Sequence, residues 1–365
     1  MGVMKIFIVI GSLTSGGAER VASRLAFFLS NSGFEVILIT IDNIDRDFYV
    51  LSPGVRRVVL GRFREGNALL KIFYFLRRAA LLRRLMIKER PYAVISLMTA
   101  PSILTLLASL GAGIKIVVSE RNYPALKPVG VFWGALRKAL YRHADMHVVQ
   151  TAKIFDWLAL NAGVKRAVII PNSIVWPLDA VSPLVMPDDI VCRDAKVLLA
   201  VGTKVHQKGF DLLLESFSAL PPRFLDWRLV LVGVDGSELA LGEKLVNRVH
   251  FVSRAGNMSD WYERASVFVL SSRYEGFPNV LLEAMSSGCA CVAFDCPTGP
   301  SELIEHEVNG LLVSPGDVSG MSRSLSILMD DADLRERLGR SAVSVRSKYS
   351  ESAIFGRWLA VLEQI

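Results

Sequence analysis

Short, almost continuously apolar segments recur along the chain and alternate with longer segments of helical periodicity. In the first half these segments read KIFIVIG, EVILIT, VRRVVL, AVISLM, KIVVSE, MHVVQT and AVIIPN, starting at residues 5, 35, 55, 93, 115, 146 and 167. Runs rich in Val and Ile that are apolar on both faces are typical of strands inside a parallel sheet. With helices between them, they predict a doubly wound α/β domain.

A second alternation of the same kind follows a proline-rich segment. Four prolines between 171 and 187 would break helix and strand alike, so PNSIVWPLDAVSPLVMPDD is expected to be a connection. The strands expected after it are KVLLAVG, RLVLVG, VHFVS, VFVLSS, CACVAFD and NGLLV. We therefore predict Rossmann-like domains over 1–175 and 193–349, facing across a cleft, and a helix over 350–365 that crosses back to the first domain.

Composition agrees with two folded domains. The chain has 365 residues, 52% hydrophobic and 21% charged, which is too long for one ordinary core and too apolar for disorder. The four cysteines, Cys192, Cys289, Cys291 and Cys296, have no CxxC spacing and predict reduced, buried thiols in a cytosolic protein rather than a zinc site. The longest apolar run is shorter than the ~20 residues of a membrane helix, and the N-terminus lacks the features of a signal peptide.

The net charge of +7 is concentrated in residues 56–90, which hold eleven basic and two acidic residues. Within it, 67–90 predicts a helix with Arg77, Arg84 and Lys88 on one side. Its opposite side would then carry Ile72, Leu76, Ala79 and Met86. This arrangement favours contact with anionic lipid headgroups or a lipid diphosphate, although the solvated face of a core helix remains an alternative.

A second candidate for a membrane interface is VGVFWGALRKALYRHA, at 129–144. Phe132 and Trp133 precede several basic residues there, and aromatic side chains beside basic ones suit an interface. Nucleic acid is the competing anionic partner. It is disfavoured because the chain holds no recognised nucleic-acid motif and its basic excess is confined to one segment.

Three strand-to-helix connections carry candidate chemistry. In the first, Gly16 and Gly17 separate a strand from a helix, where free N–H groups favour an anion; a simple tight turn is the alternative. In the second, Lys204 and Lys208 stand beside Gly209 at another helix start, which predicts a phosphate site unless both lysines are merely solvated. Neither connection is a GxGxxG or Walker loop.

The third connection, YEGFPNVLLEAMSSG, contains two carboxylates. Glu275 falls in the loop and Glu283 about a turn inside the following helix, so the two cannot share one helical face. A helix start that favours anions would not place carboxylates against phosphate. We therefore expect them to accept hydrogen bonds from hydroxyl groups on either side of a diphosphate, as in a nucleotide-sugar. The alternative for Glu283 is a capping or surface role.

Taken together, SGGAER, QKGFDLL, EGFPNVLLEAMSSG and DCPTGPSELIEHEVNGLLV resemble the retaining glycosyltransferases of family 4, which have the GT-B fold. The branch that the chain resembles most extends polyprenyl-diphosphate-linked oligosaccharides, like the bacterial N-acetylgalactosaminyltransferases of N-glycan and O-antigen assembly. The resemblance covers nearly the whole chain. It implies transfer of a hexose or N-acetylhexosamine from a nucleotide-sugar, with UDP expected as the nucleotide.

The resemblance also implies residue roles. Glu275 would hold the donor sugar, Glu283 the ribose, and Lys208 the departing diphosphate, which makes Lys208 and Glu275 the implied catalytic residues. Backbone N–H groups of Phe277, Asn279 and Val280 would face the sugar and diphosphate, and the backbone near Arg254 would read the base. The implied donor-binding residues are Gly16, Gly17, Gly202, Thr203, Lys204, Lys208, Arg254, Glu275, Phe277, Pro278, Asn279, Val280 and Glu283.

Two positions depart from the family pattern. The chain has Thr203 where the family usually has arginine, and the neighbouring Lys204 should point the opposite way if the strand continues. After the fifth strand, where many members have histidine, it has Glu-Arg-Asn. The residues expected on the acceptor side are Arg20, Glu120, Arg121 and Asn122.

Cleavage of a sugar–phosphate bond leaves negative charge on the diphosphate, which cations and N–H dipoles stabilise. The chain has no Asp-x-Asp motif at a strand end, and the DAD triplet at 331–333 falls in a helical region. No metal or other cofactor is therefore expected. The family implies retention, in which the acceptor attacks the face that the diphosphate leaves and no protein nucleophile is required.

Two other functions stay open at this point. A UDP-sugar 2-epimerase on the same fold would turn over donor without an acceptor, and a non-catalytic membrane-associated protein would only bind it. The favoured expectation is a glycosyltransferase at the cytoplasmic face of the inner membrane. Its partners would be a nucleotide-sugar, a polyprenyl-diphosphate-linked glycan and an anionic membrane surface.

Overall fold

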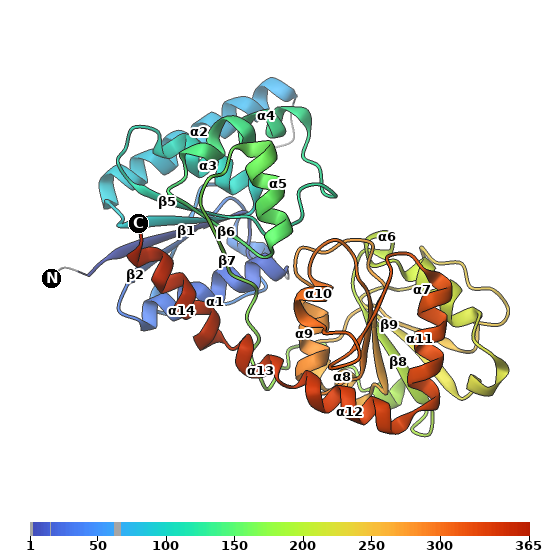
Figure 1. Ribbon diagram of the computed structural model, residues 1–365. Helices are drawn as coiled ribbons and strands as arrows, with labels where there is room; N and C mark the ends of the chain where they lie inside the picture. The colour runs from blue at the N-terminus through green and yellow to red at the C-terminus, as the bar shows by residue number, and fades with distance from the viewer. Residues whose placement is uncertain (1–2, 15, 62–66) are drawn as a thin grey trace. The chain divides into compact units, whose positions relative to one another are not determined.

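The chain forms two compact units in the computed structural model, which describes residues 3–14, 16–61 and 67–365. The first domain comprises Met1–Asn172 together with Ile354–Ile365, and the second comprises Ser173–Ala353 (Figure 1). Each is a parallel sheet with helices on both faces, as the near-continuous apolar runs predicted. Every strand expected from the sequence is present, so the two-domain α/β fold is confirmed.

The first domain holds a seven-stranded parallel sheet in the order β3-β2-β1-β4-β5-β6-β7. The strands are β1 (Lys5–Ile10), β2 (Glu35–Thr40), β3 (Val55–Val59), β4 (Ala93–Leu97), β5 (Lys115–Ser119), β6 (Met146–Val149) and β7 (Ala167–Ile169). The helices are α1 (Gly17–Asn31), α2 (Ala68–Glu89), α3 (Thr99–Ser109), α4 (Val131–Leu140), α5 (Ala152–Ala162) and α14 (Glu351–Glu363), with short 3-10 turns at Ile44–Arg46 and Tyr141–His143.

Helices α2, α3, α4 and α5 cover one face of this sheet, and α1 and α14 the other (Figure 1). Side chains such as Phe7, Val94 and Leu104 are fully or almost fully buried between the sheet and the first set. On the second face Phe355 of α14 packs against Phe28 of α1, with ring centroids 5.2 Å apart. Tyr92 donates a hydrogen bond to the Leu362 carbonyl at 2.9 Å, which ties α14 to the residue directly before β4.

The second domain holds a six-stranded parallel sheet in the order β10-β9-β8-β11-β12-β13. The strands are β8 (Lys196–Val201), β9 (Trp227–Val232), β10 (Val249–Val252), β11 (Val267–Leu270), β12 (Cys291–Phe294) and β13 (Leu311–Val313). The helices are α6 (Val205–Lys208), α7 (Phe210–Ser218), α8 (Met258–Arg264), α9 (Asn279–Ser286), α10 (Pro300–Leu303), α11 (Val318–Asp330), α12 (Ala332–Ala342) and α13 (Val345–Lys348), with 3-10 turns at Pro187–Asp189 and Pro222–Phe224.

Helices α7 and α11 pack on one face of this sheet and α8 and α9 on the other (Figure 1). Phe210, Phe217 and Leu325 fill the space between α7, α11 and the strands. The DAD triplet has a structural role, because the Asp331 carboxylate accepts a hydrogen bond from the Leu334 N–H at 2.8 Å and caps α12.

The proline-rich segment after Asn172 belongs to the second domain and does not hang free as a linker. Val181 donates to the Gly256 carbonyl at 3.1 Å, and Gly256 donates to the Pro183 carbonyl at 2.7 Å. The amide of Asn257 accepts from the Val185 N–H at 2.9 Å and donates to its carbonyl at 3.0 Å. Proline ended the regular structure, as expected, but a buried asparagine amide supplies the pairing that a strand partner would otherwise give.

Candidate active site

The carboxyl ends of β8 and β11 mark the place in the second sheet where the strand order reverses. The connection after β8 runs to β9 on one side, and the connection after β11 runs to β12 on the other. In open α/β sheets, ligands bind outside the strand ends at such a switch point. The segments that follow these two strands, 202–209 and 271–278, hold most of the donor-binding residues predicted from the sequence.

Lys208 and Glu275, which lie 67 residues apart in the sequence, form an ion pair at this switch point. The Lys208 ammonium lies 2.7 Å from Glu275 Oε1, and the two side chains are only 14% and 8% exposed. The Ser272 hydroxyl donates to the same carboxylate oxygen at 2.6 Å. A largely buried carboxylate is thus held by one ammonium and one hydroxyl. Such charge-assisted hydrogen bonds are among the strong ones, and a ligand at this place would meet one cation and one anion side by side.

Two glycines make this approach possible. Gly209 has φ +63° between α6 and α7, and a Cβ there would overlap the carbonyl oxygen of Ser271. Gly202 follows β8 directly, and a Cβ at this position would lie 2.5 to 2.8 Å from the Cγ, Cε and Cδ atoms of Lys208. The lysine side chain therefore lies directly against the Gly202 backbone, which only glycine permits.

Glu283 is placed in α9, as predicted, and is 8% exposed. Its Oε2 accepts a hydrogen bond from the Tyr262 hydroxyl of α8 at 2.9 Å. Glu275 lies in the loop before this helix, so the division into one loop carboxylate and one helix carboxylate is confirmed. A role for Glu283 as a solvated surface residue is wrong, because its side chain is buried between two helices.

The turn between Glu275 and α9 is well packed. Phe277 is 6% exposed and its ring lies 5.9 Å from that of Tyr349. Pro278 caps α9, and the carbonyl of Pro278 accepts from Leu281 and Leu282. The N–H of Asn279 donates to the Phe277 carbonyl at 3.0 Å. The Asn279 N–H, predicted to face the donor sugar and diphosphate, is therefore already hydrogen-bonded within the turn. The same role for the N–H groups of Phe277 and Val280 stays a prediction.

The predicted orientation of Lys204 rested on a continuing strand, and that premise is wrong. β8 ends at Val201, and Lys204 is the residue before the short helix α6. The alternation of side chains along a strand therefore does not apply here. Thr203 and Lys204 are both exposed, as is Arg254 beyond β10, and their contacts with a donor stay predictions.

The start of α1 in the first domain is occupied by a carboxylate of the chain itself. Gly16 is the cap residue and Gly17 the first helical residue. The Glu19 side chain folds back over Gly16, so that a Cβ on Gly16 would overlap its carboxylate, and the Ser12 hydroxyl donates to Glu19 at 3.4 Å. A donor phosphate bound here, as predicted, would replace one anion by another at the helix start.

Glu120 follows β5 and was expected to line the acceptor side, but it is 1% exposed. The Tyr141 hydroxyl donates to Glu120 at 2.9 Å, and the Thr99 hydroxyl lies 3.1 Å from both of its oxygens. Burial raises the pKa of this carboxyl, and burial together with Glu120 raises that of Tyr141. Glu120 therefore joins β5, α3 and the turn after α4 from the inside, and direct contact with an acceptor would need this cluster to open.

Arg121 is also buried, at 6% exposed, and burial lowers its pKa to about 10. It donates to Asn172, at the end of the first domain, and lies 3.5 Å from the Ser119 hydroxyl. Asn122 is half-buried and Arg20 lies in the first turn of α1. The acceptor role of these residues stays a prediction. Arg121 is buried just beyond the carboxyl end of β5 and does not lie on an open surface.

The exposed face of α2 differs from the one expected. Arg77, Arg84 and Lys88 are exposed, and Ala79 and Met86 are buried, as predicted. Ile72 and Leu76, expected on the side opposite these basic residues, are also exposed, at 42% and 52%. Arg78, by contrast, is 8% exposed because its guanidinium turns inward and donates to the Gly61 carbonyl at 3.0 and 2.8 Å.

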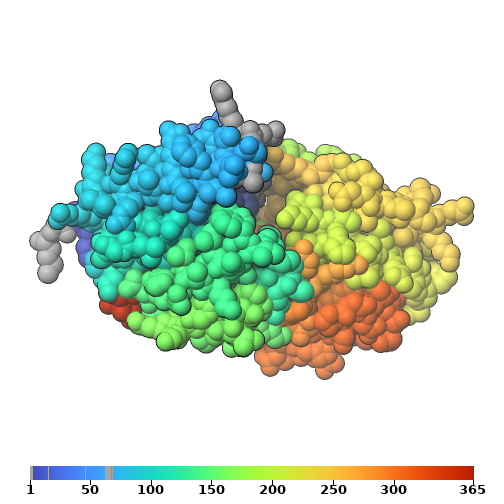
Figure 2. All heavy atoms as spheres, turned by 90° about the horizontal axis from the view of Figure 1, so that it is seen from above, coloured from blue at the N-terminus to red at the C-terminus, as the bar shows by residue number. Residues whose placement is uncertain are grey.

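The outer face of α2 consequently combines apolar and basic side chains. Leu69, Phe73 and Leu76 are 76%, 63% and 52% exposed, and at 3.6 residues per turn they share one face with Arg77 and Arg84 on its shoulder. Figure 2 shows this segment at the surface of the first domain. In α4, Phe132 is 52% exposed, whereas Trp133 is half-buried and packs edge-on against Phe75 at 5.2 Å. Of the two predicted interface aromatics, only Phe132 lies open.

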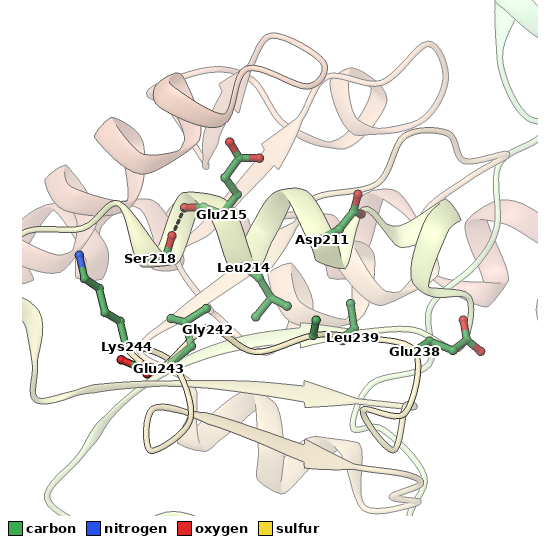
Figure 3. Close-up of a pocket in the computed structure, with 11 residues that line it drawn as sticks. Asp211, Leu214, Glu215, Ser218, Glu238, Leu239, Gly242, Glu243 and Lys244 are labelled. Carbon is green, nitrogen blue, oxygen red and sulfur yellow. Dashed lines mark hydrogen bonds between the residues drawn. The ribbon is translucent and has the colours of Figure 1, made fainter.

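A separate cavity of about 600 Å³ lies beside α7 (Figure 3). Its walls come from α7 and the connection between β9 and β10, and its lining residues include Asp211, Leu214, Glu215, Glu238, Leu239 and Glu243. Neither Lys208 nor Glu275 lines it. The switch-point chemistry described above therefore lies outside this cavity.

The cysteines and potential metal ligands change the picture little. Cys289, Cys291 and Cys296 are buried free thiols, and burial raises the pKa of Cys289 to about 12; Cys192 is exposed, so its predicted burial is wrong. Within the described ranges, no three His, Cys, Asp or Glu side chains come together as metal ligands would. The expectation of no metal requirement stays a prediction. No helix of the described residues is both long and apolar enough to cross a membrane.

Several site partners have no signal in the sequence. Tyr262, which contacts Glu283, precedes it by 21 residues and comes from another helix. Ser272, by contrast, is the second residue after β11, so its place at the carboxyl end of that strand could be expected from the sequence. Asp211 and Arg273, 62 residues apart, form a bidentate ion pair beside the Lys208–Glu275 pair. Only the sheet order brings such residues together.

Comparison with known proteins agrees with this architecture. Residues 15–175 match the family model "Glycosyltransferase Family 4", and residues 195–331 match "Glycosyl transferases group 1". The chain is 28% identical over 366 residues to the amylovoran biosynthesis glycosyltransferase AmsD of Erwinia amylovora, covering 98% of this chain and 99% of that one. It is 27% identical over 351 residues, 92% of each chain, to the Campylobacter jejuni N-acetylgalactosamine-N,N'-diacetylbacillosaminyl-diphospho-undecaprenol 4-alpha-N-acetylgalactosaminyltransferase.

Solved structures share the fold over the full length. Anabaena HepE in complex with UDP and glucose superposes with a TM-score of 0.82, at 18% identity, covering 99% of this chain and 100% of HepE. Two parallel-sheet Rossmann-like domains, each matching a glycosyltransferase model, define the GT-B class. The protein is a glycosyltransferase of this class, with a family 4 match in its first domain and a group 1 match in its second.

Proposed function

We propose that the protein moves a hexose or N-acetylhexosamine, with retention, from a UDP-sugar to a polyprenyl-diphosphate-linked oligosaccharide in surface polysaccharide or glycan assembly. The observation that carries this proposal is the Lys208–Glu275 pair at the switch point of the second sheet. It sets one cation and one largely buried carboxylate side by side, as the leaving diphosphate and the hydroxyls of a transferred sugar require.

The chemistry follows from charge. The bond between the anomeric carbon and the diphosphate oxygen breaks, and an acceptor hydroxyl oxygen forms the new glycosidic bond on the same face. The hydroxyl proton passes to the departing diphosphate, so no protein group need change its charge. Lys208 stabilises the charge that develops on that diphosphate, a kind of interaction worth about 10²–10³ in kcat. Glu275 accepts hydrogen bonds from the sugar and fixes its position.

Donor and acceptor are proposed from the relatives together with the site. HepE binds UDP and glucose on the same fold, and Glu283 with Tyr262 offers an acceptor and a hydroxyl where a ribose would lie. The names of AmsD and of the Campylobacter jejuni transferase describe amylovoran biosynthesis and a diphospho-undecaprenol acceptor. By this proposal the first domain binds a lipid-linked glycan of the same chemical class.

The test is a donor panel with and without acceptor. The protein is incubated with UDP- and GDP-sugars and a polyprenyl-diphosphate-linked oligosaccharide, and nucleotide diphosphate release and glycan mass are followed. We expect release only when the acceptor is present, and its loss in Glu275→Ala. An active Glu275→Ala enzyme would sink the proposal. Donor turnover without acceptor would point to an epimerase-like enzyme instead.

We also propose that α2 holds the protein on an anionic membrane, at the cytoplasmic face where the lipid-linked acceptor would be met. The support is the shared face of Leu69, Phe73 and Leu76 with Arg77 and Arg84, since apolar and basic side chains together suit the headgroup boundary. Each basic residue near an anionic surface contributes about 1 kcal/mol.

Vesicle sedimentation tests this membrane role. Replacing Arg77, Arg84 and Lys88 by Glu should weaken binding to phosphatidylglycerol vesicles by at least about 100-fold, since three contributions of about 1 kcal/mol add to two decades. The matched control replaces three exposed arginines of the second domain, Arg193, Arg323 and Arg340, which are 84%, 70% and 79% exposed. Equal losses in both triple variants would show bulk charge and not α2 to be the cause.

A further inference from the structure

The Lys208–Glu275 pair joins two segments that come from different strands. Beyond the pair itself, the Ser271 hydroxyl donates to the Lys208 carbonyl at 2.8 Å. The Arg273 N–H donates to the Gln207 carbonyl at 2.9 Å, and the Gln207 amide donates to the Tyr274 carbonyl at 3.3 Å. Segment 271–275 is thus fastened along α6, the short helix that carries Lys208.

The Arg273 side chain extends this fastening across the bend at Gly209. Its Nη1 donates to the His206 carbonyl of α6 at 2.9 Å. Nη1 and Nη2 also donate to the two carboxylate oxygens of Asp211 at 2.7 and 2.6 Å, and Asp211 lies in the first turn of α7. One guanidinium therefore links α6, α7 and the Glu275 loop in a fixed plane, which a bidentate arginine does and a lysine does not.

The pair fixes geometry as well as contributing to folding. Arg273 and Asp211 are 27% and 51% exposed, so solvent screens the attraction between them, although a bidentate pair is the kind that still contributes to stability. The hydrogen bonds from Arg273 lower the pKa of Asp211, and those to Asp211 raise the pKa of Arg273, so both groups are charged across the neutral range. Geometry is fixed because its three hydrogen bonds join Arg273, two residues before Glu275, to His206 and Asp211, which stand on either side of Lys208 in the chain.

We propose that Arg273 and Asp211 are positioning residues that hold the Lys208 ammonium against Glu275 in the geometry needed for donor cleavage. The proposal rests on the function proposed above, since it assigns the pair a part in that same reaction. Neither side chain needs to touch the donor. Asp211 lies on the wall of the α7 cavity (Figure 3) and not in the switch-point segments.

Kinetics supply the first test. Arg273→Gln and Asp211→Asn should each lower kcat by about 10- to 100-fold, since misplacement of a catalytic group by 1 Å from a remote change costs up to about 10². The donor KM should change less, and the double variant should lose no more than either single one. Arg273→Lys, which keeps the charge but not the fork, should recover part of the rate at most. It also serves as the second variant if Arg273→Gln folds poorly.

The matched control is another exposed Arg–Asp pair of the same domain. Arg223 and Asp330 make contacts of 3.3 and 2.8 Å with 59% and 50% exposure, and Arg223 belongs to the 3-10 turn before β9. Arg223→Gln should leave kcat unchanged. If it lowers kcat as much as Arg273→Gln does, loss of an exposed pair explains both and the positioning role is overturned.

A labelling experiment separates this inference from the proposed function. An amine-acylating reagent is added in limiting amount and modification is quantified by mass spectrometry, with exposed Lys204 as the internal reference. Lys208, hydrogen-bonded to Glu275, should react slowly in the wild type. Its rate relative to Lys204 should rise several-fold in Arg273→Gln and not in Arg223→Gln.

The outcomes divide cleanly. Faster labelling of Lys208 in Arg273→Gln, together with no transfer activity in the wild type, would refute the proposed function but support the positioning role of Arg273 and Asp211. Unchanged labelling and unchanged kcat in Arg273→Gln would overturn that positioning role while leaving the proposed function intact. A fall in activity that only tracks the folded fraction, measured by thermal unfolding in the same buffer, would also overturn it.

Discussion

A single added methyl group at Gly202 tests whether the position of Lys208 matters. In Gly202→Ala the new Cβ would lie 2.5, 2.6 and 2.8 Å from the Cγ, Cε and Cδ atoms of Lys208. Carbon atoms in contact stay about 3.5–4.0 Å apart. The lysine chain must therefore move by about 1 Å, and the 2.7 Å contact of its ammonium with Glu275 must lengthen or break.

The expected effect is large on catalysis and small on folding. A displacement of about 1 Å at a catalytic group costs up to about 10² in rate, or about 2.7 kcal/mol of transition-state stabilisation. Gly202 is not in the left-handed region, and the atoms it meets belong to a flexible side chain, so alanine is tolerated by the backbone. We expect a loss of less than about 1 kcal/mol in the free energy of unfolding.

Nucleotide diphosphate release from a UDP-sugar, with acceptor, measures the first effect, and denaturant unfolding the second. Gly242→Ala is the control, because a Cβ at Gly242 meets nothing within 4 Å. A double variant distinguishes displacement of Lys208 from direct blocking of the donor by the new methyl group. In Gly202→Ala combined with Lys208→Ala the clash is gone, so the double variant should be no slower than Lys208→Ala alone. Wild-type kcat in Gly202→Ala would refute the role given to Lys208.

Three further changes probe other parts of the structure. Gly209→Ala should lower the free energy of unfolding by more than about 2 kcal/mol in denaturant titrations, because φ is +63° and the Cβ overlaps a backbone carbonyl. Glu283→Gln should raise the donor KM more than it lowers kcat in steady-state assays, as loss of uniform ribose binding predicts. Burial lowers the pKa of His147 to about 4, from an unfolded value near 6.5. The unfolded chain then binds more protons in this window, so stability should fall by up to about 3 kcal/mol as pH drops from 6.5 to 4. In His147→Phe this part of the pH dependence, measured by thermal unfolding, should disappear.

Apolar periodicity was enough to predict the strands and the division into two sheets. Strands buried on both faces need nearly continuous Val and Ile, and no other element of the chain shows that pattern. The faces of α2 were harder. Arg78 is buried because a single backbone carbonyl, that of Gly61, accepts its guanidinium. A pattern of residue types cannot show such a contact, so the burial of Arg78 had no signal in the sequence.

The sequence predicts individual residues of the candidate site but not their pairing. Glu275 and Glu283 are recognisable as carboxylates beside apolar runs, and Lys208 as a cation at a helix start. Their pairing depends on β8 and β11 being neighbours in the sheet, which sequence order does not reveal. Glu120 and Arg121 were expected to be open because they follow a strand end, yet Tyr141, Thr99 and Asn172 enclose them.

The proline-rich segment is hydrogen-bonded to Gly256 and Asn257, and this determines where a fragment containing the second domain alone must begin. A fragment that starts at residue 193, as the proline pattern alone suggests, would remove the partners of Asn257, whose buried amide exchanges two hydrogen bonds with Val185. Removing that segment exposes the amide to water, so the cost is the net value of the two lost hydrogen bonds, about 1–3 kcal/mol together. The autonomous folding unit is expected to be 173–353, and the shorter fragment should melt earlier and bind hydrophobic dye at its exposed edge.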